Sequence, residues 1–206
     1  MSRRLGFTVD LASCTGCKAC QIACKDKNGL VEGILWRRVA EVNGGSWTKQ
    51  AATWLDETWT YHVSMACMHC SRPICVEVCP TKAMHKRSDG IVVIDTDRCM
   101  GCQYCAWACP YAAPQFDETR GVMTKCDLCR DHIAMGRDPA CVEACMMRVL
   151  TLVDLNAGEE RAKIQRDDIY PLPPANLTEP TTDLVPHRDV ERAARGGPRV
   201  GNREEI

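Results

Sequence analysis

Sixteen cysteines in four groups of four constrain this 206-residue chain more than any other feature of its sequence. Each group opens with C-x2-C and closes with C-x3-C, and only the gap between these pairs varies. The groups are Cys14, Cys17, Cys20 and Cys24; Cys67, Cys70, Cys75 and Cys79; Cys99, Cys102, Cys105 and Cys109; and Cys126, Cys129, Cys141 and Cys145. Every cysteine belongs to a group, so the pattern is an internal repeat with insertions.

The spacing of the first and third groups matches the cluster ligands of bacterial two-cluster ferredoxins, in which the fourth cysteine ligates the other cluster. Three ligands at this spacing can wrap three corners of an iron-sulfur cube. Pro80 and Pro110 follow a fourth cysteine and favour a turn there. Gly16 and Gly101 leave room for backbone N–H groups beside the sulfur atoms. The pattern therefore predicts 4Fe-4S clusters.

Other uses of these cysteines fit less well. Disulfides need an oxidising compartment, and C-x2-C pairs close loops too short to stabilise much. Zinc sites join two separated C-x2-C pairs and need no further cysteine followed by proline. A c-type haem needs a histidine directly after C-x2-C, which no group has. The histidines are expected to be ordinary polar residues, with one alternative: His69 can tune a cluster through a hydrogen bond.

Chain order predicts which groups share a module. The second and third groups are close in sequence and form an inner module, which leaves the first and fourth to form an outer module around it. Crossing the fourth ligands gives four predicted 4Fe-4S clusters, with iron held by all sixteen cysteines. Cluster 1 has Cys14, Cys17, Cys20 and Cys145; cluster 2 has Cys24, Cys126, Cys129 and Cys141; cluster 3 has Cys67, Cys70, Cys75 and Cys109; cluster 4 has Cys79, Cys99, Cys102 and Cys105.

The predicted fold class is α+β: two nested bacterial ferredoxin-like modules, each holding two 4Fe-4S clusters, with an insert and an extended C-terminal arm. Short strands are expected at 6–10, 61–65, 91–95 and 149–153. Hairpins are expected at 83–95, turning at Asp89-Gly90, and at 115–126, turning near Arg120-Gly121. Helical turns carry the closing C-x3-C pairs. The predicted domains are 1–24 plus 120–155 (outer module), 25–60 (insert), 61–119 (inner module) and 156–206 (arm).

The insert holds four of the five tryptophans, Trp36, Trp47, Trp54 and Trp59. We expect it to cover the modules as a small local core, an interpretation favoured over a docking surface. The arm contains six of the eleven prolines, from Pro171 onward. Because repeated proline blocks regular structure, this segment is predicted to be extended or disordered.

Composition excludes several classes of function. The chain has 26 basic and 27 acidic residues and a net charge of −1, which gives no electrostatic footprint for nucleic acid. No apolar run approaches the length of a membrane-spanning helix, so no direct membrane span is predicted. The sequence shows no phosphate-binding loop, dinucleotide motif or metalloprotease motif. The predicted chemistry is one-electron relay without catalysis.

The cysteine groups, together with GGSW at 44–47, AMHKRSDG at 83–90, PYAAPQ at 110–115 and PLPPANLTEP at 171–180, resemble the iron-sulfur subunit of dimethyl sulfoxide reductase over nearly the whole chain. Related subunits of nitrate reductase carry Trp in place of one ligand of the third group, whereas this chain keeps Cys102, so all four clusters are expected to be cubes. Met146, where the motif has proline, departs from the pattern and alters the expected turn.

The resemblance implies a relay of electrons in anaerobic respiration, from an integral membrane anchor that oxidises quinol to a molybdopterin catalytic subunit. Polysulfide, tetrathionate and arsenate remain open as other acceptors. A soluble polyferredoxin is a different class, which the insert and the arm disfavour. The arm is expected to lie along the catalytic subunit through Leu172, Leu177, Leu184 and Val185. Location follows from the partners: peripheral to the membrane, with the periplasmic face of the inner membrane favoured over the cytoplasmic face.

Overall fold

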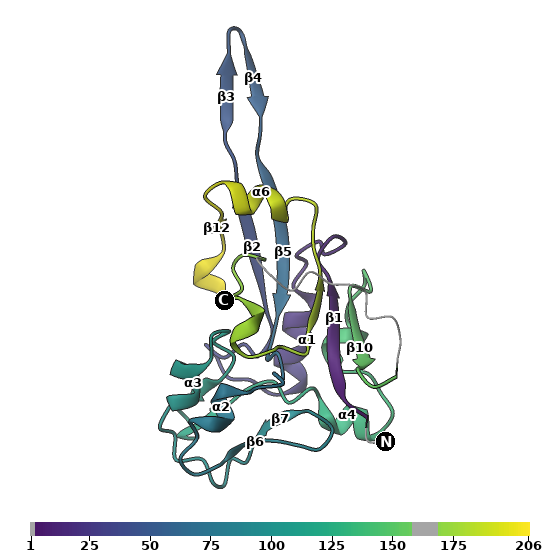
Figure 1. The fold of residues 1–206 in the computed structure, drawn as a ribbon, viewed down its shortest axis with the longest axis vertical. Helices are drawn as coiled ribbons and strands as arrows, with labels where there is room; N and C mark the ends of the chain where they lie inside the picture. Colours follow the sequence, from purple (N-terminus) through teal and green to yellow (C-terminus); the bar gives the residue numbers. More distant parts are fainter. Residues whose placement is uncertain (1–2, 158–168) are drawn as a thin grey trace.

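The computed structural model describes residues 3–157 and 169–206, which form two three-stranded sheets, three hairpin sheets and short helices (Figure 1). The first sheet has the order β10-β1-β11 and the second β12-β2-β5. Their strands are β1 (Leu5–Asp10), β10 (Leu150–Asp154), β11 (Asp183–Val185), β2 (Arg38–Gly44), β5 (Trp59–Met65) and β12 (Arg199–Val200). The mixture of strands and short helices agrees with the predicted α+β class.

The first sheet joins the two ends of the cysteine-bearing region. β1 pairs antiparallel with β10, so that Phe7 lies opposite Leu152. β1 also pairs in parallel with β11, where Val9 lies opposite Leu184. The apolar side chains Leu5, Phe7 and Val9 alternate along β1 and so lie on one face of the sheet, where each is at most 3% exposed. Residues 5–10 therefore lie beside residues 150–154, although the whole inner region separates them in sequence.

Both predicted hairpins between the cysteine groups are confirmed. β6 (Met84–Lys86) pairs with β7 (Val92–Ile94), and β8 (Gln115–Asp117) pairs with β9 (Val122–Thr124). The glycines of the two turns, Gly90 and Gly121, have φ angles of 86° and 67°. Only glycine adopts such angles at low cost, so these residues set the turns.

The helices are short, and four of the six in the described residues carry a cysteine of a closing pair. They are α1 (Ala19–Lys27), α2 (Ile74–Glu77), α3 (Tyr104–Ala108), α4 (Arg130–Ala134), α5 (Ala140–Glu143) and α6 (Val190–Arg195), with 3-10 turns at Ala175–Leu177 and Arg203–Glu205. α1 packs against α5, and α2 packs against α3. The first and fourth cysteine groups therefore meet in space, as do the second and third.

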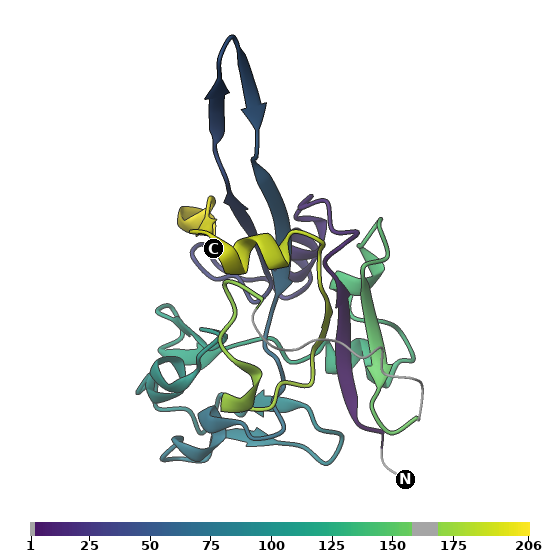
Figure 2. The ribbon, with the colours of Figure 1, turned by 45° about the horizontal axis from the view of Figure 1, so that its top comes forward.

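The insert is not a local core around its tryptophans. β2 and β5 extend into a second hairpin, β3 (Trp47–Gln50) with β4 (Thr53–Asp56), which projects away from the body in both views (Figures 1 and 2). Trp59 is buried at the base, but Trp47 and Trp54 are 58% and 60% exposed on the projecting part. The expectation is wrong for these two residues because a two-stranded ribbon is a single layer, with no second layer of the described residues packed on its faces.

The main hydrophobic core combines side chains of both three-stranded sheets. Phe7, Val9, Val42, Tyr61 and Val63 belong to it and are at most 1% exposed. A smaller cluster lies in the inner region and joins two cysteines to three apolar residues: Cys75, Met84, Val92, Cys105 and Met123. Cysteines are thus part of both cores, since Cys20, Cys141 and Cys145 belong to the main one.

The described part of the C-terminal arm is packed rather than extended outward, which corrects the prediction. Figure 2 shows residues 169–206 running over the body and ending beside the base of the projecting hairpin. β11 joins the first sheet, and Thr181 donates hydrogen bonds to the carbonyl of Met68 from its N–H and its hydroxyl, each at 3.0 Å. Leu184 is 7% exposed, whereas Leu177 is 55% exposed. Proline limits helices and ladders but does not prevent a segment from packing on an existing surface. Residues 158–168 of the predicted arm lie outside the described residues.

Candidate iron-sulfur sites

Two of the predicted ligand sets line cavities. One cavity is lined by Cys14, Cys17, Cys20 and Cys145, together with Ser64, Met147 and other residues. A second is lined by Cys79, Cys99, Cys102 and Cys105, together with Met84, Met123 and others. In both cases the cysteine from a distant part of the chain faces the same cavity as the three that are close in sequence. This lining is compatible with the crossed ligand sets, which stay a prediction.

The other two sets are brought together by the same packing. The charges of Cys67, Cys109 and Cys70 raise the pKa of Cys75, after the larger effect of burial. The pKa of the Cys24 thiol is raised to about 12, first by burial and then by the charge of Cys141. The charge of Cys24 likewise raises the pKa of Cys126, and the charge of Cys129 raises the pKa of Cys24, in both cases after the larger effect of burial. Each predicted set is therefore a group of neighbouring thiols.

Burial makes these thiols hard to ionise without a cation. Desolvation raises the pKa of Cys70 and Cys105 to about 11, and raises the pKa of Cys126 well above its ordinary value. A cluster or metal ligand must be a thiolate. Four adjacent thiolates in a buried site need compensating positive charge, which the irons of a cluster supply. The cysteines of each set therefore fit the predicted 4Fe-4S cluster.

Hydrogen-bond donors surround several of the sulfur atoms. The backbone N–H groups of Met84 and Met123 donate to the sulfurs of Cys79 and Cys99, each at 3.4 Å. Burial acts to raise the pKa of Cys79, but the N–H of Met84 and neighbouring donors lower it overall. The hairpins β6–β7 and β8–β9 therefore supply main-chain donors to Cys79 and Cys99, a role that the sequence pattern did not reveal.

Three buried side-chain nitrogens have no hydrogen-bond partner among the described residues: Nε of Arg37, Nε of Arg38 and Nε2 of His69. The two arginine nitrogens are N–H donors. Burial acts to lower the pKa of both arginine side chains, and the charges of nearby cysteines act to raise it. Nδ1 of His69 accepts the N–H of Val92 at 3.1 Å, so the neutral ring carries its proton on the unpartnered Nε2. The sulfides of a bound cluster would be acceptors for such unpartnered N–H donors. A tuning role for His69 stays a prediction.

Two basic residues that the sequence analysis passed over are buried near the cysteines. Arg37 is 2% exposed and Lys125 is 3% exposed, and Lys125 donates to the carbonyl of Cys126 at 2.9 Å. Lys125 also lowers the pKa of Cys75, although burial outweighs it. Their positions could be identified only from the structure, since a charged residue in a sequence is normally exposed.

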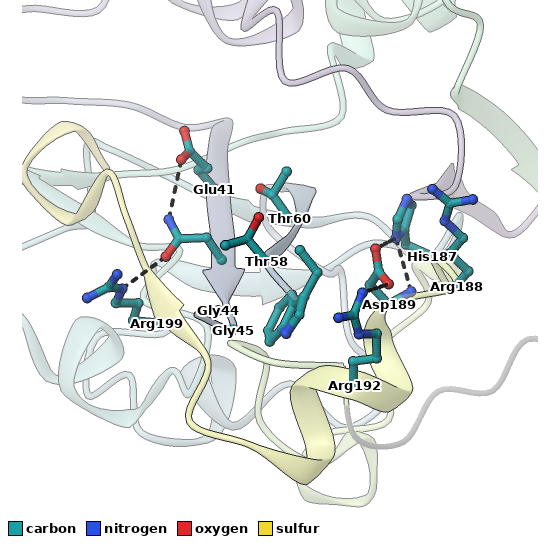
Figure 3. A pocket seen from close by; sticks show the side chains of 12 residues that line it. Glu41, Gly44, Gly45, Thr58, Thr60, His187, Arg188, Asp189, Arg192 and Arg199 are labelled. Atoms are coloured by element: carbon teal, nitrogen blue, oxygen red, sulfur yellow. Dashed lines mark hydrogen bonds and ion pairs between the residues drawn. The ribbon is translucent and has the colours of Figure 1, made fainter. Parts of the chain in front are cut away.

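A separate hollow on the surface lies away from the cysteines. It has a volume of about 640 Å³, sits at the base of the projecting hairpin, and is lined by residues of β2, β5 and the C-terminal segment. Figure 3 shows Asp189 between His187 and Arg192 on one side and Arg199 on the other. Nε of Arg199 donates to Oδ1 of Asn43 at 3.1 Å. No cysteine lines it. Within residues 3–157 and 169–206, no trio of His, Cys, Asp or Glu is arranged to hold a single metal ion.

Comparison with known proteins agrees with the cysteine geometry. Two families described as 4Fe-4S dicluster domains match residues 58–155 and 13–83. The iron-sulfur subunit of the anaerobic dimethyl sulfoxide reductase of Escherichia coli is 45% identical, over 91% of both proteins. A sulfite dehydrogenase subunit of Allochromatium vinosum is 34% identical, over 90% of this chain and 84% of its own length. The formate dehydrogenase iron-sulfur subunit of Wolinella succinogenes is 35% identical, over 73% and 82%.

Fold, cysteine sets and relatives define the class of the protein: a ferredoxin-type iron-sulfur subunit that transfers electrons within an oxidoreductase complex and is not its catalytic subunit. The chain belongs to the family of dimethyl sulfoxide reductase iron-sulfur subunits. The relatives are single subunits of larger enzymes, which implies a catalytic partner. No helix in the described part of the chain is long and apolar enough to cross a bilayer.

Proposed function

We propose that the chain holds four 4Fe-4S clusters in two nested modules, with the crossed ligand sets predicted from the sequence. The observation that carries this proposal is the pair of cavities, each lined by three cysteines of one group and one from a distant group. The α1–α5 and α2–α3 packing supports the same pairing of groups for the other two sets.

The boundary between the modules falls later than residue 119. Hairpin β8–β9 spans residues 115–124, and a cut at 119 would divide it. Met123 packs with Met84, Val92 and Cys105, and its N–H donates to Cys99. We therefore assign residues 61–124 to the inner module, and residues 1–24 with 125–155 to the outer module.

The four sites follow one another in space. Cys20 of the first set is close enough to Cys141 of the second for their charges to interact, and Cys126 of the second set interacts with Cys67 of the third. The third and fourth sets share the packed helices α2 and α3. The order 1–2–3–4 places sites 1 and 4 at the two ends of the relay.

Each bound cluster would carry one electron at a time, at a potential set by charge, hydrogen bonds and exposure. The protein fixes the positions of the ligand sulfurs. It also keeps water away from the middle of the series, since the cysteines of sites 2 and 3 are the more deeply buried. Exposed Cys17 marks the surface at site 1. These features support transfer between two partners rather than storage in an isolated protein.

The partners we propose are a molybdopterin catalytic subunit and an integral membrane anchor that oxidises quinol, with dimethyl sulfoxide as acceptor. The 45% identity to a subunit of dimethyl sulfoxide reductase supports this substrate over the sulfite or formate that the names of the less similar relatives give. Polysulfide, tetrathionate and arsenate are the alternative acceptors, for which the chain would have the same role as an electron relay. The complex would lie at the membrane, with the periplasmic face favoured.

The test is to purify the complex without oxygen and to measure iron, sulfide and zinc. Four cubes contain about sixteen irons and as many sulfides. We expect that content, near-zero zinc, and turnover of dimethyl sulfoxide with a quinol donor. Stoichiometric zinc in a colourless protein would overturn the cluster assignment. Sixteen irons with turnover of another acceptor would overturn only the choice of substrate.

A further inference from the structure

Arg37 is a buried cation between two cysteine sets. Its side chain is 2% exposed, although it lies only two residues before the apolar core residue Val39 on β2. An arginine that is removed from water without a partner costs several kcal/mol, so a buried one needs compensating charge and hydrogen bonds. The surroundings of Arg37 show where that compensation comes from.

One contact links Arg37 to site 1 through a serine. Nη1 of Arg37 donates to the hydroxyl of Ser64 at 3.1 Å. The same hydroxyl lies 3.4 Å from the sulfur of Cys20. Because the Arg37 proton occupies a lone pair of the Ser64 oxygen, the serine's own proton is free to point at the sulfur. Arg37 therefore orients a donor toward a ligand of site 1.

No carboxylate neutralises Arg37 in residues 3–157 and 169–206, where the structure records no ion pair for it. Its guanidinium lies over the ring of Phe7, 4.8 Å from the ring centre. Desolvation acts to lower the pKa of Arg37, but the charges of Cys141, Cys20, Cys126 and Cys24 raise it overall. Cysteines of both predicted sites therefore lie close enough to Arg37 for their charges, as thiolate ligands of a bound cluster, to act on it.

Arg37 is influenced by cysteines of two predicted sets, while Lys27 also acts on Cys129 of site 2. Cys20 belongs to site 1, and Cys24, Cys126 and Cys141 belong to site 2. The Nε–H of Arg37 has no partner within the described residues and is available to a sulfide or thiolate. Arg37 therefore lies where one charge acts on two neighbouring clusters at once.

We propose that Arg37 is the counter-charge shared by clusters 1 and 2, and that with Ser64 it positions hydrogen bonds that keep both clusters easier to reduce. This inference rests on the proposed four-cluster assignment. Reduction adds one negative charge to a cluster, so a fixed cation beside it favours the reduced form. Among the cysteines of the described residues, the Ser64 hydroxyl has a hydrogen bond with Cys20 alone, so its direct effect is on cluster 1.

The experiment is a potentiometric titration of the whole complex, followed by paramagnetic resonance, in three variants. Arg37→Met removes the charge and keeps an unbranched side chain. Arg37→Lys keeps the charge, and Ser64→Ala removes only the hydroxyl. Arg195→Met is the matched control, because Arg195 is 81% exposed. Iron content and the variants Cys14→Ser and Cys126→Ser identify the signals of clusters 1 and 2.

We expect Arg37→Met to disfavour reduction of clusters 1 and 2 by at least about tenfold, which for a one-electron couple is about 59 mV. Clusters 3 and 4 should shift less than threefold, as should every cluster in Arg195→Met. Arg37→Lys should restore most of the shift. Ser64→Ala should affect cluster 1 alone. Unchanged potentials in Arg37→Met with full iron content would overturn the proposal.

Failure to assemble is also informative. If Arg37→Met loses iron while Arg37→Lys retains it, positive charge is required at this position, which supports the proposal. If both variants lose iron, the role of Arg37 is packing against Phe7, and the proposal is wrong. Wild-type complex without about sixteen irons would instead contradict the four-cluster assignment itself, so the two ideas fail in different measurements.

Discussion

Leu184 tests whether the C-terminal segment completes the fold. Leu184→Ala removes a side chain that is 7% exposed, belongs to the main core and lies on β11 opposite Val9. Truncation of a buried leucine to alanine costs about 2–5 kcal/mol, from lost transfer free energy and the cavity left behind. Leu177 provides the matched control, because it is 55% exposed and its truncation should cost less than about 0.5 kcal/mol.

A cost of about 3 kcal/mol corresponds to roughly two orders of magnitude in the unfolding equilibrium, at about 1.4 kcal/mol for each factor of ten. Loss of a cluster is irreversible, so the useful measurement is a rate. Bleaching of the visible absorbance is followed with an iron chelator at several temperatures, and Leu184→Ala should bleach at least about tenfold faster than wild type. Leu177→Ala should match wild type.

Equal bleaching rates for Leu184→Ala and Leu177→Ala, both with full starting iron, would refute the packing of this segment on β1. The reverse order, with Leu177→Ala the less stable, would place the buried anchor at the 3-10 turn Ala175–Leu177 instead of at β11.

The same geometry leads to three further predictions. Cys24→Ser should damage the paramagnetic signal of cluster 2 and spare the signal that Cys14→Ser removes; a match between the two spectra would overturn the crossed ligands. Trp47→Ala with Trp54→Ala should keep all iron but reduce copurification of the catalytic subunit by at least about tenfold, since exposed apolar side chains on a projecting hairpin mark a docking surface; unchanged copurification contradicts this. Ending the chain after Tyr170 should lower iron content, because the segment beyond it bonds to the loop of the second cysteine group; full iron content would show that the segment is dispensable.

The ligand chemistry was readable from the sequence because it depends on local spacing. Cysteines three positions apart can face one cube only from a tight loop, and glycine beside them relieves that loop. Gly16 and Gly101 indeed have φ angles of 69°, next to Cys17 and Cys102. The hairpins were readable for the same reason, since a turn with a positive φ angle selects glycine within a few residues.

The surroundings of the sulfurs were not readable, because they depend on contacts between distant segments. Ser64 reaches Cys20 across 44 residues, and Met123 reaches Cys99 across 24. Arg37 has no sequence signal, because an arginine before an apolar strand is usually exposed. The exposure of Trp47 and Trp54 likewise depends on whether another layer covers the hairpin, which composition does not specify.

The sequence by itself determined the chemistry of the sites, since sixteen thiols at fixed short spacings admit few cofactors. It also predicted the pairing of the groups, because nesting leaves the outer groups only each other, and the α1–α5 and α2–α3 packing supports that prediction. Tertiary structure alone decided which charges and donors lie beside each sulfur and how the C-terminal segment is used. The physical reason is range: ligand loops are fixed by dihedral angles over a few residues, whereas burial and electrostatic neighbours arise only when strands such as β1, β10 and β11 come together.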